Sequence, residues 1–538
     1  MKRLSSLCLL LGLLLSCTSP AATPAPPPTI PTVAQATAVL TATPSPTAVP
    51  SATLPPPTVT QSPTATPQPV CDTPAAWGGW CFETNLFVHP IALTAIDDVF
   101  YLLDGGRVLA LTATAPPQTL LRPQDTIGGT VVIEPLDLTA VGRELLVLDR
   151  AGDVYRYDTQ TQQWAIDRYD RLIEETSSHY FVALTTAAES RFLIEASYYY
   201  GIRYEADGTE AGWTLPEAYY IDVAADREDE QSVAYVLTRP FGAAADQLTR
   251  FYRGQPDKQF IPALEIRQGR ELVLTDNILW LLDQAGQRLT ALNRQNGQVL
   301  EQVTLPVAIS SFWAAADGSQ LILAGRDTLY FVDEPAQNRV ISGGEPFSGR
   351  APHDPAVLAS LTGLLIPTSG AAIADRDLRM PGAPRHYRLG VHEGVDFYWS
   401  PGKAVLATAA GTVIRAETAY QPPSEQAFAN QRAEAREVGY TPEDILDFYR
   451  GRQVWLEHDN GLISRYAHLS AIADGLTVGQ PVAAGEIIGE VGNSGSPASL
   501  EGPTADAHLH FELWLGDYYV GQFLRPIETR EWLAQILE

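Results

Sequence analysis

The sequence has 538 residues, and its 36 Lys and Arg against 63 Asp and Glu give a net charge of −27 at pH 7. Nucleic-acid-binding proteins usually present a basic surface, so this balance excludes nucleic acid as an expected partner. Hydrophobic residues make up 45% of the chain, an ordinary share for a globular protein, and the length is sufficient for two or more folded units.

Residues 1–17 have the layout of a secretory signal. Lys2 and Arg3 precede an apolar run that is too short to span a bilayer. The sequence LLSC at the end of this run resembles the lipobox of bacterial lipoproteins, which implies that Cys17 is lipidated. We expect an extracellular protein that is anchored to the cell surface and touches the membrane only through this N-terminal lipid. An ordinary signal, without lipidation of Cys17, would make the protein secreted.

Residues 18–70 contain no charged residue, no aromatic residue and no glycine. A Pro/Thr-rich segment of this kind cannot bury enough surface to fold, and it favours extended conformations. We expect a disordered, semi-stiff stalk. Cys71 and Cys81 follow it, and outside the cell they are expected to close a small loop as a disulfide, the alternative being two free thiols.

Residues 71–344 contain a repeated pattern of two apolar strands joined by a polar turn. The pattern occurs six times at a spacing of about 45 residues, for example in VFYLLDGGRVLALT, LLVLDRAGDVYRYD and LWLLDQAGQRLTALN. This period predicts a β-propeller of six or seven blades, with a pair of β-sandwiches as the alternative. A propeller at this place is expected to bind a protein or glycan partner, which the sequence does not identify.

The rest of the chain consists of a Pro-containing linker, residues 345–362, and a region of Gly-punctuated strands, residues 363–538. A helical insertion is expected at 418–451, where Thr441 would cap a helix, and the sequence PIETREWLAQILE predicts a closing helix. The predicted fold class is therefore all-β: a propeller followed by a small antiparallel sheet domain with a helical insertion.

Histidines in the last region occur in motifs that suit a metal. His508 and His510 in AHLHFEL are two residues apart, so on a strand both side chains lie on one face. HEGVDF adds His392 and Asp396. A hydrolytic zinc site uses three such ligands and leaves one position for water, so His392, Asp396 and one histidine of the pair would form a suitable set.

The motifs HEGVDF, RYAHLS, GEIIGEVGNSG and HLHFEL occur in the order found in the M23 family, the lysostaphin-like zinc peptidases that cleave peptidoglycan. The resemblance covers residues 363–538. It implies that His392, Asp396 and His510 bind one Zn²⁺ per chain and that His468 and His508 are catalytic. How the general-base and oxyanion roles divide between these two histidines stays open.

The sequence departs from the family pattern in three places. The insertion at 418–451 is long, the loop SPASLEGPTADA before the histidine pair is extended, and Arg525-Pro526 replaces the usual Asp/Asn-Pro. We expect the insertion to form a wall or lid of the substrate groove, the alternative being a solvated decoration.

Together these features predict a surface-tethered, zinc-dependent endopeptidase that hydrolyses peptide bonds of peptidoglycan, with the propeller serving in targeting or regulation. The alternative is a non-catalytic cell-wall binding or regulatory protein in which the propeller recognises a partner.

Overall fold

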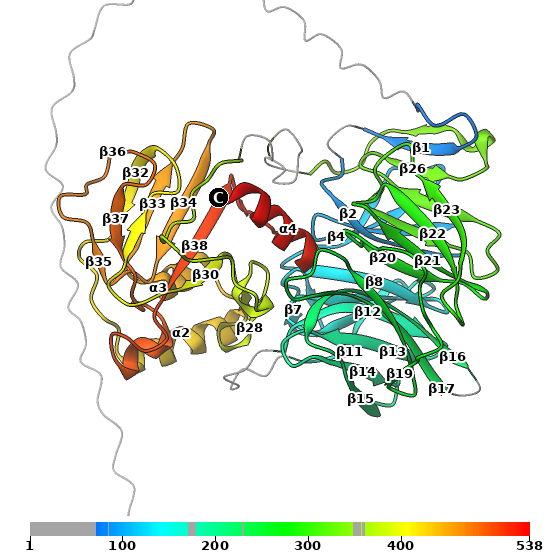
Figure 1. Cartoon of the computed structure of the whole chain (residues 1–538), viewed down its shortest axis with the longest axis horizontal. Coiled ribbons are helices and arrows are strands. Elements are labelled where there is room, and N and C mark those ends of the chain that lie inside the picture. The colour runs from blue at the N-terminus through cyan, green and yellow to red at the C-terminus, as the bar shows by residue number, and fades with distance from the viewer. Residues whose placement is uncertain (1–70, 84–85, 171–178, 229–230, 348–356, 358–360) are drawn as a thin grey trace, which may run out of the picture. The chain divides into compact units, whose positions relative to one another are not determined.

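The computed structural model describes residues 71–83, 86–170, 179–228, 231–347, 357 and 361–538 (Figure 1). The predicted signal, with Cys17, and the predicted stalk at residues 18–70 lie outside the described residues. No helix within the described ranges has the length and apolar character that crossing a membrane requires.

Six sheets form the blades in the first part of the described chain, and five of them are antiparallel with four strands in chain order. The strands of these five sheets are β2 (Pro90–Ile96), β3 (Val99–Asp104), β4 (Arg107–Leu111) and β5 (Gln118–Leu121); β8 (Pro135–Val141), β9 (Glu144–Asp149), β10 (Val154–Asp158) and β11 (Gln163–Arg168); β12 (Phe181–Ala187), β13 (Ser190–Glu195), β14 (Tyr200–Tyr204) and β15 (Glu210–Thr214); β16 (Ala218–Glu228), β17 (Gln231–Pro240), β18 (Gln247–Tyr252) and β19 (Gln255–Pro256); β20 (Glu271–Leu274), β21 (Ile278–Asp283), β22 (Arg288–Asn293) and β23 (Val299–Thr304). A short hairpin, β6 (Thr126–Ile127) with β7 (Thr130–Val131), lies between the first two sheets.

The sixth sheet closes the ring. It contains β24 (Ser311–Ala314), β25 (Leu321–Ala324) and β26 (Thr328–Phe331), and β1 (Gly78–Phe82) from the start of the described chain pairs with β26. β27 (Arg339–Ile341) adds a parallel strand beyond β1, after the short helix η1 (Pro335–Gln337). A disulfide joins Cys71 to Cys81 beside this closure.

The first strand of each sheet contacts the first strand of the next. These contacts link β2, β8, β12, β16, β20 and β24 in order, and β24 in turn contacts β2. A closed ring of radial sheets with the N-terminal strand in the last blade is a β-propeller. The predicted propeller is thus confirmed, and within the described residues it has six blades.

In three blades, an acidic residue at the repeated position accepts hydrogen bonds from the backbone at the start of its own blade. Asp104, at the end of β3, accepts hydrogen bonds from the backbone N–H groups of Val88 and His89, just before β2. Asp149 and Glu195 accept the corresponding bonds in the next two blades. Because buried N–H groups need acceptors, these repeated acids serve the hydrogen bonding of the fold.

A second set of carboxylates joins neighbouring blades at their innermost strands. Asp137 on β8 accepts a hydrogen bond from the backbone of Leu184 on β12. Asp222 on β16 and Glu271 on β20 do the same for the next strands in the ring. Burial, which disfavours a negative charge, raises the pKa of Asp137 to about 6 and that of Asp222 and of Glu271 to about 8.

Arg525, in the last loop of the chain, supplies a cation to these acids. Its guanidinium donates to the backbone carbonyls of Ile91 and Ser310 and lies 3.8 Å from Glu271. These residues belong to one compact unit of the chain. The arginine that replaces the family's usual residue before Pro526 therefore has a partner in the propeller.

The last part of the chain forms an antiparallel sheet in the order β30-β38-β34-β33-β32-β36, with β39 paired to β38, and two smaller sheets, β31-β37-β35 and β28-β29 (Figure 1). The elements are η2 (Asp377–Arg379), β28 (Pro384–Arg385), η3 (His386–Arg388), β29 (Gly390–Val391), β30 (Val395–Tyr398), β31 (Ala404–Leu406), β32 (Gly411–Ala416), α2 (Glu425–Val438), α3 (Glu443–Arg450), β33 (Val454–Glu457), β34 (Leu462–Ala467), β35 (Ala471–Ile472), β36 (Pro481–Val482), β37 (Ile487–Glu490), η4 (Pro497–Glu501), β38 (His508–Leu515), β39 (Tyr518–Tyr519) and α4 (Pro526–Ile536).

The insertion contains two helices. Ser424 caps α2 by accepting a hydrogen bond from the backbone of Ala427, and Gly439 ends the helix with a φ of 84°. The predicted cap of α3 was wrong: Pro442 precedes the helix, and the hydroxyl of Thr441 donates to the backbone carbonyl of Arg388 instead. Thr441 thus donates to a distant carbonyl instead of accepting from a backbone N–H of the first helical turn.

Candidate metal centre

Three neighbouring strands bring the predicted site residues together. β38 lies between β30 and β34, and its register with β30 places Asp396 directly opposite His510 and Tyr398 opposite His508. Leu509, on the other face of β38, is fully buried in the hydrophobic core. The predicted sharing of one face by His508 and His510 is confirmed.

His392 enters the site from the turn between β29 and β30. The glycine in HEGVDF is required by packing, because a Cβ at Gly394 would lie 2.4 Å from the backbone oxygen of Phe511 on β38. With glycine, the turn can approach β38 closely enough for the imidazole of His392 to reach His510. The spacing of His392 and Asp396 therefore depends on a residue that has no side chain.

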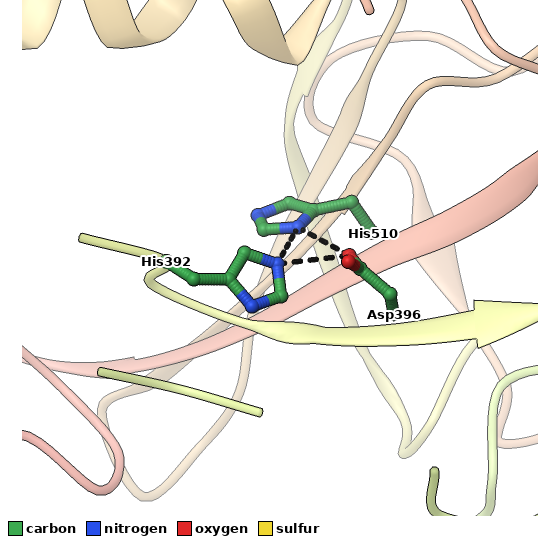
Figure 2. A group of neighbouring side chains, drawn as sticks. All are labelled: His392, Asp396 and His510. Carbon is green, nitrogen blue, oxygen red and sulfur yellow. Dashed lines mark hydrogen bonds and ion pairs between the residues drawn. The ribbon is translucent and has the colours of Figure 1, made fainter. Parts of the chain in front are cut away.

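Three ligand atoms converge on one point (Figure 2). His392 Nε2 lies 2.8 Å from Asp396 Oδ1 and 2.8 Å from His510 Nδ1, and His510 Nδ1 lies 3.0 Å from Asp396 Oδ1. All three side chains are buried. These are the three residues that the sequence predicts as metal ligands, and the structure brings them together.

The hydrogen bonds on the far side of each imidazole decide which nitrogen faces the site. His392 Nδ1 lies 3.0 Å from the backbone carbonyl of Met380, and His510 Nε2 lies 2.9 Å from a carboxylate oxygen of Glu512. Both partners can only accept, so these nitrogens carry the protons. The lone pairs of His392 Nε2 and His510 Nδ1 therefore point at each other and at Asp396, an arrangement that fits a divalent cation such as Zn²⁺.

Burial and neighbouring charges shift the pKa values of the two ligand imidazoles in opposite directions. Burial and the nearby Arg385 lower the pKa of His392 to about 3. Burial also acts to lower the pKa of His510, but its hydrogen bonds with Asp396 and Glu512 outweigh this and raise it to about 9. A second proton on His510, at Nδ1, would therefore compete with a metal ion for the lone pair that faces Asp396.

The two histidines predicted to be catalytic flank this centre. His468 follows β34, and its Nδ1 lies 2.7 Å from the backbone carbonyl of Ser494. His508 Nδ1 lies 2.7 Å from the carbonyl of Asp506, and the two rings are 4.8 Å apart. Both Nδ1 atoms therefore carry protons, and both Nε2 atoms are left to accept one.

His468 adopts a left-handed backbone conformation, with a φ of 61°. Such a conformation is uncommon for a residue with a side chain and persists only where surrounding contacts impose it. Here the backbone N–H of His468 donates to the carbonyl of Arg450, the last residue of α3. The insertion thus helps to set the position of one of the two histidines.

Sequence reasoning missed the residues that support the ligands. Glu512 holds His510, and its own partner is Arg450, whose Nε lies 2.7 Å from Glu512 Oε1. Glu512 follows His510 by two residues on the same strand, so the alternation that identified the histidine pair also contained this signal. No local sequence pattern predicts that Arg450 and the carbonyl of Met380 support the ligands.

A cavity of about 990 Å³ opens onto the five site residues. Residues of α2 and α3, including Arg432 and Tyr449, form part of its lining, and so do Ser496 and Asp506 from the extended loop before the histidine pair. The insertion and the extended loop, two of the three departures from the family pattern, therefore border the same cavity. The insertion is a wall of this cavity.

Comparison with known proteins identifies the region that carries the site. Residues 390–521 match peptidase family M23. The M23 region contains all three converging ligands and both flanking histidines, and the match supports a metallopeptidase. No curated protein matches the chain.

Over the middle of the chain, the similar solved structures are propeller-like proteins. Virginiamycin B lyase from Staphylococcus aureus is 12% identical, with a TM-score of 0.33, and the match covers 47% of this chain and 98% of that one. BamB from Moraxella catarrhalis is 13% identical, with a TM-score of 0.29 and coverage of 45% and 82%. The WD40 β-propeller domain of Doa1 is 9% identical, with a TM-score of 0.32 and coverage of 45% and 77%.

Proposed function

We propose that the protein is a zinc-dependent endopeptidase that hydrolyses peptide bonds of peptidoglycan. One observation carries the proposal: two imidazole lone pairs and a carboxylate converge, and each imidazole is held in the required tautomer by an acceptor on its far side. Three donor atoms within hydrogen-bond distance of one another, with the two imidazoles oriented by outer partners, are what a metal ion requires. The M23 match supports the reaction class.

When bound, Zn²⁺ would polarise the scissile carbonyl and lower the pKa of a water molecule. His392, Asp396 and His510 would hold the ion, while Met380 and Glu512 keep the two imidazoles oriented. Nδ1 of His468 and of His508 lies against a backbone carbonyl, which leaves Nε2 of each ring as the nitrogen that can exchange a proton with the substrate. One can take the proton from the attacking water, and either, once protonated, can stabilise the developing oxyanion.

The test combines metal analysis with product analysis. The zinc-loaded protein should release peptides with new amino and carboxyl termini from purified peptidoglycan, as identified by mass spectrometry, and a chelator should abolish the release. His508→Ala is the matched control, because it leaves all three ligands in place. A protein that holds one zinc per chain yet produces no new termini would be a wall-binding protein instead.

Two further parts of the proposal concern place and targeting. The lipobox-like sequence at Cys17 and the Pro/Thr-rich stalk support an enzyme that is tethered outside the cell membrane. The propeller would then bind a protein or glycan partner and so direct or regulate the peptidase. A fragment that contains the M23 region alone can be compared with the whole chain for binding to wall glycans. If both bind equally well, the propeller has no targeting role.

A further inference from the structure

The cavity at the metal centre carries an excess of positive charge. Seven arginines and two aspartates line it, and one of these aspartates is the ligand Asp396. The whole chain, in contrast, has 36 basic against 63 acidic residues. The basic lining is therefore a local feature and does not follow from the composition.

Two of these arginines have structural carboxylate partners. Arg388 lies 3.0 Å from Glu393, and Arg450 lies 2.7 Å from Glu512. A third, Arg385, lies 3.4 Å from Asp396 Oδ2, the oxygen that faces away from His392 and His510. The charge of these three is at least partly balanced within the protein.

Three others have no such partner. Among the described residues, no carboxylate forms an ion pair with Arg376, Arg379 or Arg432. The guanidinium carbon of Arg379 lies 3.7 Å from the ring centroid of Tyr398, and that ring stacks on His508 at 4.8 Å. This series of stacked groups leads from a guanidinium directly to a residue of the site.

Arg432 faces the same cavity from the insertion. It lies on α2, is half-buried, and lines the cavity together with Tyr449 of α3. Arg379 and Arg432 thus approach the cavity from two separate segments of the chain. A partly buried guanidinium keeps its charge, and its planar fork binds a carboxylate through two parallel hydrogen bonds.

We propose that this cavity selects peptide segments that bear free carboxylates, with Arg379 and Arg432 as specificity-determining residues. The inference rests on the proposed peptidase function and adds the chemical class of its substrate. Positive groups in a concave site concentrate the local potential and raise the local concentration of anions, even on a protein of net negative charge. The carboxylates of the substrate would occupy the positions that protein acids leave open.

The experiment compares two forms of one substrate. Soluble peptides from purified peptidoglycan are used as such and after conversion of their carboxylates to amides with carbodiimide and ammonia. We expect amidation to lower kcat/KM of the zinc-loaded enzyme by about tenfold or more, the loss typical of hydrogen bonds to a charged group. Equal kcat/KM for the two forms, together with equal binding, would overturn the proposal.

The variants test the named residues. Arg379→Gln combined with Arg432→Gln should remove the preference for free carboxylates, whereas Arg432→Lys, which keeps the charge, should retain most of it. Arg267→Gln, at a side chain 60% exposed in the propeller region, is the matched control and should change nothing. Unaltered zinc content and melting temperature exclude misfolding as the cause. A preference that persists in the double variant would contradict the assignment.

A binding measurement separates this inference from the proposed function. Zinc-loaded His468→Ala, which keeps the ligands and both arginines, is titrated with the free and amidated peptides. Carboxylate-dependent binding without any cleavage by the native protein would support the cavity's selectivity and refute the peptidase. If a phosphate-bearing wall polymer binds at the cavity while the two peptide forms bind equally, the selectivity for carboxylates is wrong.

Discussion

Arg450, the last residue of α3 in the insertion, forms a buried ion pair with Glu512, and Glu512 holds His510, one of the three converging ligands. The insertion therefore does more than border the cavity, because its end supports a ligand. Outer partners of this kind orient the ligand and raise its basicity. Removing the arginine would also leave the charge of Glu512 buried without a cation.

We therefore expect Arg450→Met to weaken zinc binding by about 10- to 100-fold, the usual effect of losing an outer-shell partner. Competition with a chromophoric chelator measures this. Arg415→Met is the control, since Arg415 pairs with Asp447 within the insertion and has no bond to the site. Equal zinc affinity of Arg450→Met and the native protein would show that Glu512 orients His510 unaided.

Ligands and flanking histidines should respond differently to removal. His392→Ala, Asp396→Ala and His510→Ala should each abolish stoichiometric zinc binding, because each removes one of three protein ligands. His468→Ala and His508→Ala should keep the metal but lose activity by about a hundredfold to ten-thousandfold, the range of general acid–base catalysis. Elemental analysis and peptide release are measured on the same preparations. An empty site in His508→Ala, with a full one in His510→Ala, would reverse the assignment.

The buried acids of the propeller predict a pH-dependent effect of Arg525. The pKa of Asp222 and of Glu271 is about 8 in the folded protein against ordinary values of 3.8 and 4.5, so the folded state holds these protons more tightly. Their contribution to stability consequently falls as pH rises from about 4 to about 8. Arg525 offsets this fall, and Arg525→Met should lower the melting temperature more at pH 8 than at pH 5.

Calorimetry at both pH values checks this expectation. Adding Glu271→Gln to Arg525→Met should restore part of the lost melting temperature at pH 8. The second change removes a buried carboxylate whose ionisation Arg525 would otherwise offset. A loss that is the same at both pH values would mean that Arg525 acts only through its bonds to the carbonyls of Ile91 and Ser310.

The proposed tethering to the membrane depends on Cys17. Replacing Cys17 with Ala should shift the protein from the membrane fraction to the soluble fraction outside the cell, because the proposed lipid on this cysteine would attach the protein to the membrane. Immunoblotting of fractionated cells expressing the full chain measures this. A variant that stays with the membrane would contradict the lipoprotein hypothesis.

The identity of the five site residues could be predicted from the sequence, since each belongs to a short motif. Alternation along a strand places His508 and His510 on one face, and the resemblance to a family distinguishes their roles. The propeller was predicted from a repeat, and in three of the blades the repeated position proved to be an acid, such as Asp104, that accepts backbone hydrogen bonds. Local periodicity carries this information because it records burial and hydrogen bonding along one strand.

The partners of those residues were decided by the tertiary structure. Arg450 and Glu512 are 62 residues apart, and the basic cavity combines Arg379 with Arg432 from different segments. Sequence alone determined which side chains could bind a metal and that a propeller precedes them. Only the pairing of distant strands and the docking of the insertion decided what holds the ligands and which charges face the cavity, because such contacts depend on the whole chain's packing and leave no local pattern.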